Sequence, residues 1–179
     1  MAPPVALRGR TVAVVGRAAS LVGRGEGEAI DSRDVVIRVN AMLPLEAGSP
    51  DDRGTRTDIL YHAKMATEER DAARKAGVPA QKRHAKLRAR LAWEREGYRP
   101  FTGTVAVFWA LIQGAVEVYA TGMDLYRGSG ALGRPGGELD WENWSHDPAG
   151  DVRLLRRLRD HCDRLRVWAP LAEILEDAR

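Results

Sequence analysis

The sequence predicts an α/β sandwich with a mostly parallel β-sheet. Short runs of β-branched and apolar residues alternate along the chain with helical patterns, and this order is typical of βαβ units. Several of these apolar runs end at glycine, asparagine or histidine, the polar or small residues expected where a strand leaves a sheet. The chain has 179 residues and no internal repeat, so we expect a single domain spanning residues 1–179.

Five strands are expected, each from a short apolar segment bounded by polar or turn-forming residues. The first ends at Gly16, and the second ends at Asn40. The third closes at His62, a candidate site residue because ligands bind at the carboxyl ends of parallel strands. The five segments are Thr11–Val15, Asp34–Val39, Thr57–His62, Val116–Thr121 and Leu165–Trp168.

Helical patterns fill most of the remaining chain. A helix begins at Thr67 and is broken by Gly77 and Pro79, and Pro170 opens a terminal helix at its first position. Loops are expected where glycine and proline gather, at residues 43–56 and again at Gly128–Gly137. The other expected helical segments are Glu26–Ile30, Ala80–Glu96, Thr104–Gln113 and Asp151–Arg164.

Composition excludes several classes of protein. The net charge is only +3, with basic and acidic residues interleaved on helices, so a nucleic-acid-binding surface is not predicted. One cysteine, Cys162, leaves no internal disulfide framework and fits a reducing compartment. The N-terminus lacks a signal-peptide pattern, and the longest apolar stretch, Val105–Ile112, is too short to span a bilayer. We therefore expect a cytoplasmic protein without a membrane span.

Two segments carry the strongest candidate binding groups. Gly16 follows the first strand, and a glycine there lets backbone amides approach a phosphate closely. Asn40 ends the second strand, where its amide serves either as a ligand group or as a turn residue that tolerates an unusual backbone. Thr102 leads into a buried helix, and its hydroxyl either caps that helix or joins the free amides in an anion site.

The strongest candidate for acid–base chemistry is His146. It follows a tryptophan-rich segment and precedes Asp151 by five positions. Histidine titrates near neutral pH and is the commonest general base in enzymes. An exposed loop histidine or the cap of the next helix is the alternative interpretation. No cluster with metal-ligand spacing is present in the sequence, so no metal site is predicted.

Taken together, these segments resemble the sialyltransferase family (glycosyltransferase family 29-like), in a short, soluble, bacterial-type form. The large sialyl motif of the family resembles Val12–Gly16 with Asp31–Asn40, continued by Gly54-Thr55-Arg56-Thr57. The small motif resembles Pro100–Gly103 with Val116–Gly122. The His-x4-Glu motif of the family, whose histidine is the catalytic base, resembles His146 and Asp151. The resemblance implies a Rossmann-like three-layer sandwich, the variant of the GT-A fold that sialyltransferases share.

The resemblance also implies which residues bind the cytidine nucleotide and sugar. His146 is the implied catalytic base, and His62 and Asp151 are further candidates. Arg17 departs from the asparagine usual in the family, and Phe101 replaces a small polar residue. Val12 and Ala115 fall where the family has a disulfide pair, which this chain lacks. The implied binding residues are Gly16, Arg17, Ala18, Ser20, Asn40, Thr102, Gly103, Thr104, Gly122 and Trp144.

The function that the resemblance implies is an inverting, metal-independent glycosyltransferase. It would use a CMP-activated sugar, sialic acid or a related ulosonic acid such as Kdo, as donor substrate, with no cofactor and an unidentified acceptor. A hydrolase (glycosidase) acting on a cytidine nucleotide, another nucleotide or a nucleotide sugar is the first alternative, and a non-catalytic nucleotide-binding module is the second. The sequence does not determine the oligomeric state.

Overall fold

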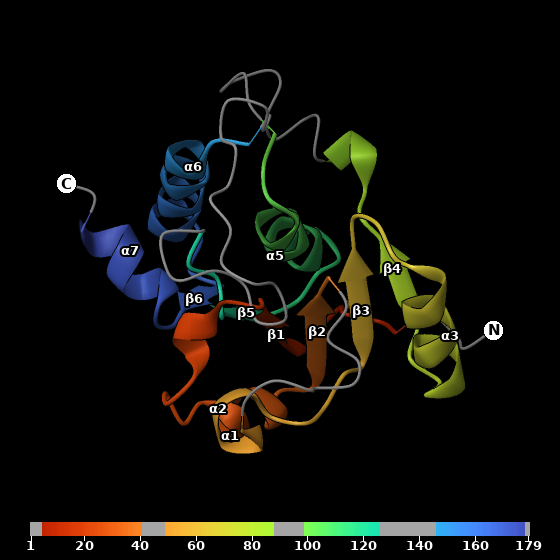
Figure 1. Cartoon of the computed structure of the whole chain (residues 1–179). Coiled ribbons are helices and arrows are strands. Elements are labelled where there is room, and N and C mark those ends of the chain that lie inside the picture. The colour runs from red at the N-terminus through yellow and green to blue at the C-terminus, as the bar shows by residue number, and fades with distance from the viewer. Residues whose placement is uncertain (1–4, 41–48, 88–98, 126–145, 178–179) are drawn as a thin grey trace.

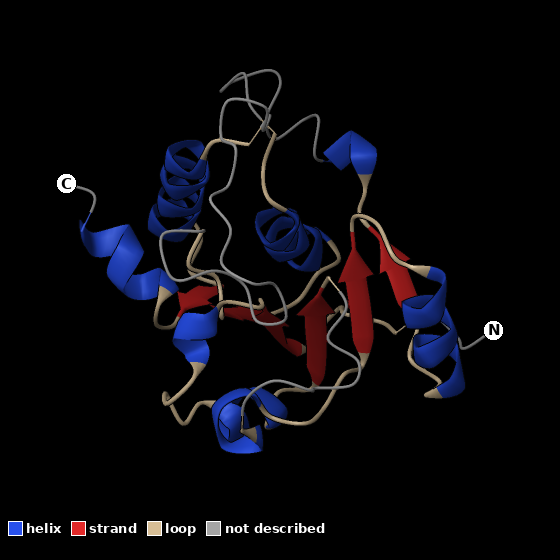
Figure 2. Cartoon of the chain, in the orientation of Figure 1, coloured by secondary structure: helices blue, strands red, loops and turns tan. Residues whose placement is uncertain are grey.

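The computed structural model describes residues 5–40, 49–87, 99–125 and 146–177. Its centre is a sheet of six strands, in the order β4-β3-β2-β1-β5-β6, and every neighbouring pair is parallel. The predicted α/β class with a mostly parallel sheet is therefore confirmed (Figure 2). The strands are β1 (Thr11–Val15), β2 (Val35–Val39), β3 (Ile59–His62), β4 (Ala80–Lys82), β5 (Glu117–Thr121) and β6 (Leu165–Val167).

Helices cover both faces of the sheet, which gives the three layers (Figure 1). One face packs against α5 (Thr102–Ile112), α6 (Pro148–His161) and α7 (Leu171–Asp177). The other face carries η1 (Ala19–Leu21), α1 (Gly27–Asp31) and α2 (Pro50–Arg53). Helix α3 (Thr67–Lys75) lies beside β4 at the edge of the sheet.

The large core lies between the sheet and α5. Helix α5 is buried on nearly all sides, as its continuous run of apolar residues predicts. Val12, Val14, Val35 and Ile37 of the central strands are fully buried against it. The smaller core on the opposite face contains Ala13, Val15, Leu21, Ile30 and Val36.

Two expected elements are wrong. The segment beginning at Ala80 was expected to form a helix, but its first three residues form edge strand β4, which pairs with β3 through Leu60. The segment 43–56 was expected to be irregular throughout, yet α2 occupies Pro50–Arg53. Ser49 caps α2 by accepting a hydrogen bond from Asp51 N, and Pro50 stands at its first position. The expected loop Gly128–Gly137 lies outside the described residues.

The remaining boundaries shift by a few residues. Helix α5 begins two residues before the expected Thr104, and α6 begins three residues before the expected Asp151. The strand order reverses direction at β1, which lies between β2 and β5. In an open parallel sheet, such a reversal leaves a crevice at the carboxyl ends of the strands, where ligands bind.

Candidate functional site

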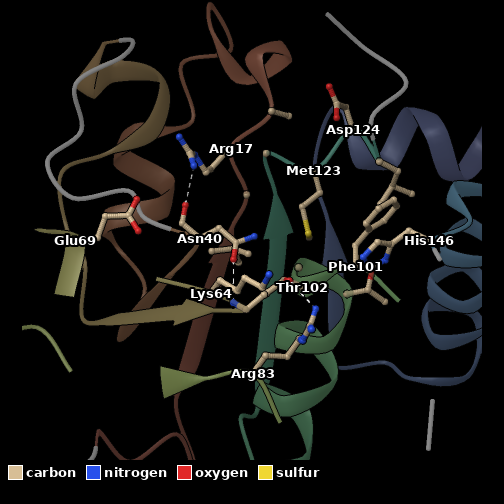
Figure 3. Close-up of a pocket in the computed structure, with 18 residues that line it drawn as sticks. Arg17, Asn40, Lys64, Glu69, Arg83, Phe101, Thr102, Met123, Asp124 and His146 are labelled. Carbon is tan, nitrogen blue, oxygen red and sulfur yellow. Dashed lines mark hydrogen bonds between the residues drawn. The ribbon is translucent and has the colours of Figure 1, made fainter. Parts of the chain in front are cut away.

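A pocket of about 510 Å³ opens at the carboxyl ends of the central strands (Figure 3). It brings together nine residues that the sequence singled out, from five separate segments of the chain. The segments are the loop after β1, the end of β2, the first turn of α5, the end of β5 and the residues just before α6 (Pro148–His161). The nine residues are Gly16, Arg17, Ala18, Asn40, Thr102, Gly103, Thr104, Gly122 and His146.

The loop after β1 is held by a close approach between two glycines. Gly16 N donates to Thr121 O at 2.9 Å, and Ala18 N donates to Gly122 O at 2.9 Å. A Cβ at Gly16 would lie 2.8 Å from the carbonyl carbon of Gly122, and Gly122 itself has a φ of +63°. Both positions therefore require glycine, for space at the first and for backbone conformation at the second.

Asn40 lines the pocket and has the turn backbone that was one of its two expected roles. Its φ of 56° is left-handed, as expected for an asparagine in a turn. Its side-chain oxygen accepts a hydrogen bond from Ala63 N at 3.1 Å, and its carbonyl oxygen accepts one from Arg17 Nη1 at 3.1 Å. This arrangement fixes the orientation of the amide, so that its nitrogen points into the pocket as a donor (Figure 3).

The first turn of α5 forms the opposite wall. The backbone N–H groups of Thr102, Gly103 and Thr104 have no carbonyl partner within the helix, because they belong to its first turn. The Thr104 side chain is fully buried, and its hydroxyl has no hydrogen-bond partner. Free amides, a buried hydroxyl and the positive end of the helix dipole together favour an anion at this position.

His146 lies beside the start of α5. Its ring stacks on Phe101 with centroids 4.9 Å apart and planes 17° apart, and its Nδ1 lies 2.5 Å from Arg99 O. A carbonyl oxygen can only accept a hydrogen bond, so the proton sits on Nδ1. In the neutral ring, Nε2 is then left as the acceptor, which is the state that a general base requires.

Asp151 lies outside the pocket and hydrogen-bonds to Phe101, which lines it. The side chain is fully buried in the first turn of α6, and both carboxylate oxygens accept from Phe101 N at 3.2 Å. His146 and Asp151 thus hold the same short segment, residues 99–101, at the entry to α5. The sequence motif formed by His146 and Asp151, five positions apart, thus places both side chains against that segment.

The other predicted residues are placed elsewhere. Ser20 lies in η1 and does not line the pocket. His62 ends β3 without lining the pocket, and its Nδ1 is buried without a hydrogen-bond partner. Burial, with smaller contributions from Arg70 and Lys82, lowers the pKa of His62. Trp144 lies outside the described residues.

Sequence reasoning missed four charged residues that line the pocket. Lys64 and Arg83 follow the carboxyl ends of β3 and β4, and Glu69 and Asp124 add two carboxylates. Lys64 could have been predicted as a site residue, because it lies two residues beyond His62, where the third predicted strand ends. Arg83 gave no such signal, because the sequence around it reads as a helix rather than as a strand.

Two features are absent from the described residues, 5–40, 49–87, 99–125 and 146–177. Within those ranges, no helix has the length and apolar character needed to cross a bilayer. Among the same residues, no three His, Cys, Asp or Glu side chains are grouped so as to hold a metal ion.

Comparison with known proteins points to one family. The family model of glycosyltransferase family 29 (sialyltransferase) matches residues 2–87. A comparison with curated protein sequences finds no match.

Solved structures of sialyltransferases share the fold. A mammalian sialyltransferase is similar with a TM-score of 0.60 and 23% identity over 89% of this chain and 68% of the other. A mammalian sialyltransferase in complex with Gal-beta-1-3GalNAc-ortho-nitrophenol gives 0.59 and 22% over 89% and 69%. The sialyltransferase CstII from Campylobacter jejuni, in complex with the substrate analogue CMP-3FNeuAc, gives 0.55 and 13% over 93% and 86%.

Proposed function

We propose that the chain is a member of glycosyltransferase family 29 (sialyltransferase), whose family model matches residues 2–87, and that it transfers a sugar from a CMP-activated donor to an acceptor hydroxyl. The donor sugar in this proposal is sialic acid or a related ulosonic acid such as Kdo. The observation that carries the proposal is the convergence, in one pocket, of the β1 loop, Asn40, the first turn of α5 and His146.

The proposed reaction is a single displacement with inversion. Nε2 of His146 takes the proton of the acceptor hydroxyl while the acceptor oxygen forms a bond to the anomeric carbon. The bond from that carbon to the phosphate oxygen breaks, and its electron pair leaves with CMP. Because attack and departure occur on opposite faces of the sugar, the configuration inverts.

The leaving phosphate needs positive charge and hydrogen-bond donors, and the pocket contains both. Arg17 supplies a guanidinium on the β1 side, and the first turn of α5 supplies amides, hydroxyls and the helix dipole. Preorganised donors of this kind stabilise charge as it develops, which is usually the largest contribution to catalysis. These groups support a mechanism in which the protein itself neutralises the leaving group without a metal ion.

Nucleotide binding tests the proposal first. We expect calorimetry to show CMP binding in preference to UMP, AMP and GMP, and we expect Asn40→Ala to weaken it about tenfold by removing a hydrogen-bond donor from the pocket. Equal binding of all four nucleotides would contradict the proposed donor. A parallel incubation with CMP-sialic acid and no acceptor measures release of free sugar, which would indicate hydrolysis instead of transfer.

The role of His146 is tested by the transfer rate of a variant rather than by its affinity for the nucleotide. We expect His146→Ala to lower kcat about 10²–10⁴-fold, the usual contribution of a general base, with CMP binding nearly unchanged. His161 provides the matched control, because it is exposed at the end of α6, where its Nδ1 hydrogen-bonds with Arg157 O of the same helix. An undiminished rate in His146→Ala would show that another group removes the proton.

The proposed compartment is the cytoplasm. Cys162, the one cysteine in the chain, is a free, half-buried thiol at the end of α6. Val12 and Ala115, at the positions of the disulfide pair of the family, both lie in the large apolar core. A fold that replaces a disulfide by apolar packing fits a reducing environment.

A further inference from the structure

A buried hydroxyl lies between two oxygen atoms at the end of β5. Thr121 is fully buried, and its Oγ1 lies 2.6 Å from Glu26 Oε2 and 2.9 Å from Ala169 O. A hydroxyl has a single proton to donate, and a carbonyl oxygen can only accept. When the proton of Thr121 is donated to Ala169 O, the short contact with Glu26 is a hydrogen bond only if the Glu26 carboxyl group carries a proton of its own.

The surroundings of Glu26 favour this neutral form. Burial raises the pKa of its carboxyl group, opposed by the Thr121 hydroxyl, which can also donate to an ionised carboxylate, and by the charge of Arg24. Arg24 is itself paired with Glu173 of α7, with Nη1 and Oε1 2.7 Å apart. Asp52 of α2 accepts from the backbone N–H of the residue just before Glu26 and adds a further negative charge. The one nearby cation is therefore already balanced by other carboxylates.

The backbone around the buried hydroxyl forms part of the pocket wall. Thr121 O accepts a hydrogen bond from Gly16 N, and the next carbonyl, Gly122 O, accepts one from Ala18 N. Gly16, Ala18 and Gly122 all line the pocket. Ala169 lies on the other side, in the connection between β6 and α7. The side chain of Thr121 thus connects the pocket wall to that part of the chain.

Loss of the proton from Glu26 would change this connection. An ionised carboxylate is a stronger acceptor than a backbone carbonyl, so the proton of the Thr121 hydroxyl would turn from Ala169 O to Glu26. The hydrogen bond between the end of β5 and the β6–α7 connection would then be lost. The wall formed by the ends of β1 and β5 would lose its support on that side.

We propose that Glu26 holds a proton in the folded chain and, through Thr121, positions the end of β5 for nucleotide binding, so that binding weakens as this proton is lost. Neither residue lines the pocket, so Glu26 is a positioning residue. Because the neutral form supports the pocket, the support is complete at low pH and is lost as the pH rises through the pKa of Glu26 in the folded chain. This inference rests on the proposed function in its use of CMP as the ligand.

NMR of the glutamate carboxyl carbons measures the proton directly, with Glu26→Gln assigning the signal. We expect the titration midpoint of Glu26 to lie above the ordinary value of about 4.3. We expect CMP to raise the midpoint by a further 0.5–1 pH unit, on the order of the coupling between two linked sites, because a ligand that favours the protonated form strengthens proton binding in return. A midpoint at or below about 4.3, or one that CMP leaves unchanged, would overturn the proposal.

Calorimetry of CMP binding over a pH series measures the same coupling from the ligand. The amide of Glu26→Gln donates to Thr121 at every pH and so imitates the protonated acid. We expect Glu26→Gln and the unmodified chain to bind CMP alike at low pH, and the unmodified chain to bind about 3–10-fold more weakly at high pH, the effect of about one hydrogen bond. Titration of the CMP phosphate and of His146 affects both chains and cancels in the ratio. Glu173→Gln is the matched control, because its side chain is 54% exposed, and it should follow the unmodified chain.

Two substitutions at Thr121 separate the hydrogen bond from the charge of the ligand. Thr121→Ser keeps the hydroxyl, whereas Thr121→Val removes it in nearly the same shape. We expect CMP to raise the Glu26 midpoint in Thr121→Ser and to leave it unchanged in Thr121→Val. An equal rise in both variants would mean that the charge of CMP acts on Glu26 directly, and it would overturn the role of Thr121.

The outcomes distinguish this inference from the proposed function. If both chains bind CMP with a ratio that does not change with pH, the role of Glu26 is wrong and the proposed function stands. If the unmodified chain binds no CMP at any pH, the proposed function fails, and the positioning role of Glu26 fails with it.

Discussion

The contact between Gly16 and Gly122 makes one substitution diagnostic of the whole site. In Gly16→Ala the new methyl would overlap the Gly122 carbonyl oxygen and lie 2.7 Å from Met123 Cγ. The carbonyl cannot retreat freely, because the same two segments are joined by hydrogen bonds from Gly16 N and Ala18 N, each 2.9 Å long. Overpacking costs about 1–3 kcal/mol and each weakened hydrogen bond about 1 kcal/mol, so we expect a loss of about 3–5 kcal/mol.

Gly103→Ala supplies the matched control. Its new methyl would meet the Met123 side chain, with Sδ closest and Cγ at 3.4 Å, and would meet no backbone outside its own helix. A methionine side chain can move aside, and alanine favours the helix by up to about 1 kcal/mol, so we expect stability within about 1 kcal/mol of the unmodified chain.

Urea unfolding followed by circular dichroism measures both changes, and differential scanning calorimetry gives the Tm. For a chain of this length, a loss of about 3–5 kcal/mol lowers Tm by about 6–20 °C. CMP binding should also be lost in Gly16→Ala, because the β1 loop forms one wall of the pocket. If Gly16→Ala proves as stable as Gly103→Ala, the close approach of the two strand ends is not present in the molecule.

Three further predictions follow from single side chains. Burial raises the pKa of the Glu26 carboxyl. The stabilisation from its neutral form is therefore fully present below the unfolded pKa of about 4.3 and is lost as the pH rises through the folded pKa. In urea titrations, the stability of the unmodified chain relative to Glu26→Gln should fall over that pH range. Burial lowers the pKa of His62, so NMR should give a titration midpoint below about 6.5. Asp31 accepts hydrogen bonds from Thr55 N, Thr55 Oγ1 and Arg56 N, and Asp31→Ala should therefore cost about 2–4 kcal/mol in urea unfolding; an unchanged urea midpoint would contradict it.

The strands of the central sheet were predictable because their side chains are buried on both faces. Val12, Val14, Val35 and Ile37 give continuous apolar runs, which a parallel sheet covered by helices requires. Strand β4 was missed because it is an edge strand: Ala80 and Lys82 are exposed, and only its pairing with β3 defines it. Main-chain pairing of that kind leaves no apolar pattern in the sequence.

Helix α2 was missed for a different reason. Proline and glycine around residues 43–56 indicate a loop, and they outweighed a helix-start signal in the same segment. Ser49 followed by Pro50 is an N-cap followed by a favourable first position, and Asp51 and Asp52 complement the positive end of the helix. The signal was present, but four residues are too few for hydrophobic periodicity to support it.

The candidate site was predictable where a residue with a suitable binding group lies at the end of a strand or the start of a helix. Gly16 and Asn40 each follow a strand, and Thr102 begins α5, where the first backbone amides have no partner within the helix, so motif and physical reason agree. Lys64 and Arg83 lie at equivalent places after β3 and β4 but belong to no motif. Their presence in the pocket depends on the strand order, which the sequence does not state.

Asp151 provides the last test of how the site is assembled. It does not line the pocket, yet both of its carboxylate oxygens accept from Phe101 N, one residue before α5 begins. In Asp151→Ala the buried Phe101 N–H loses its acceptor, so we expect a loss of about 1–3 kcal/mol in urea unfolding. The start of α5 also orients Thr102 and stacks on His146, so the transfer rate should fall as well.

Asp151→Asn separates positioning from charge. Asparagine retains one acceptor oxygen in nearly the same shape, and it can keep Phe101 N bonded while removing the negative charge beside the start of α5. If Asp151 acts only by positioning that segment, Asp151→Asn should recover most of the kcat lost in Asp151→Ala, with KM for the donor little changed in both. A kcat for Asp151→Asn as low as that of Asp151→Ala would show that the carboxylate charge itself is needed, and that His146 and Asp151 act as an electrostatic pair rather than as two supports of one helix terminus.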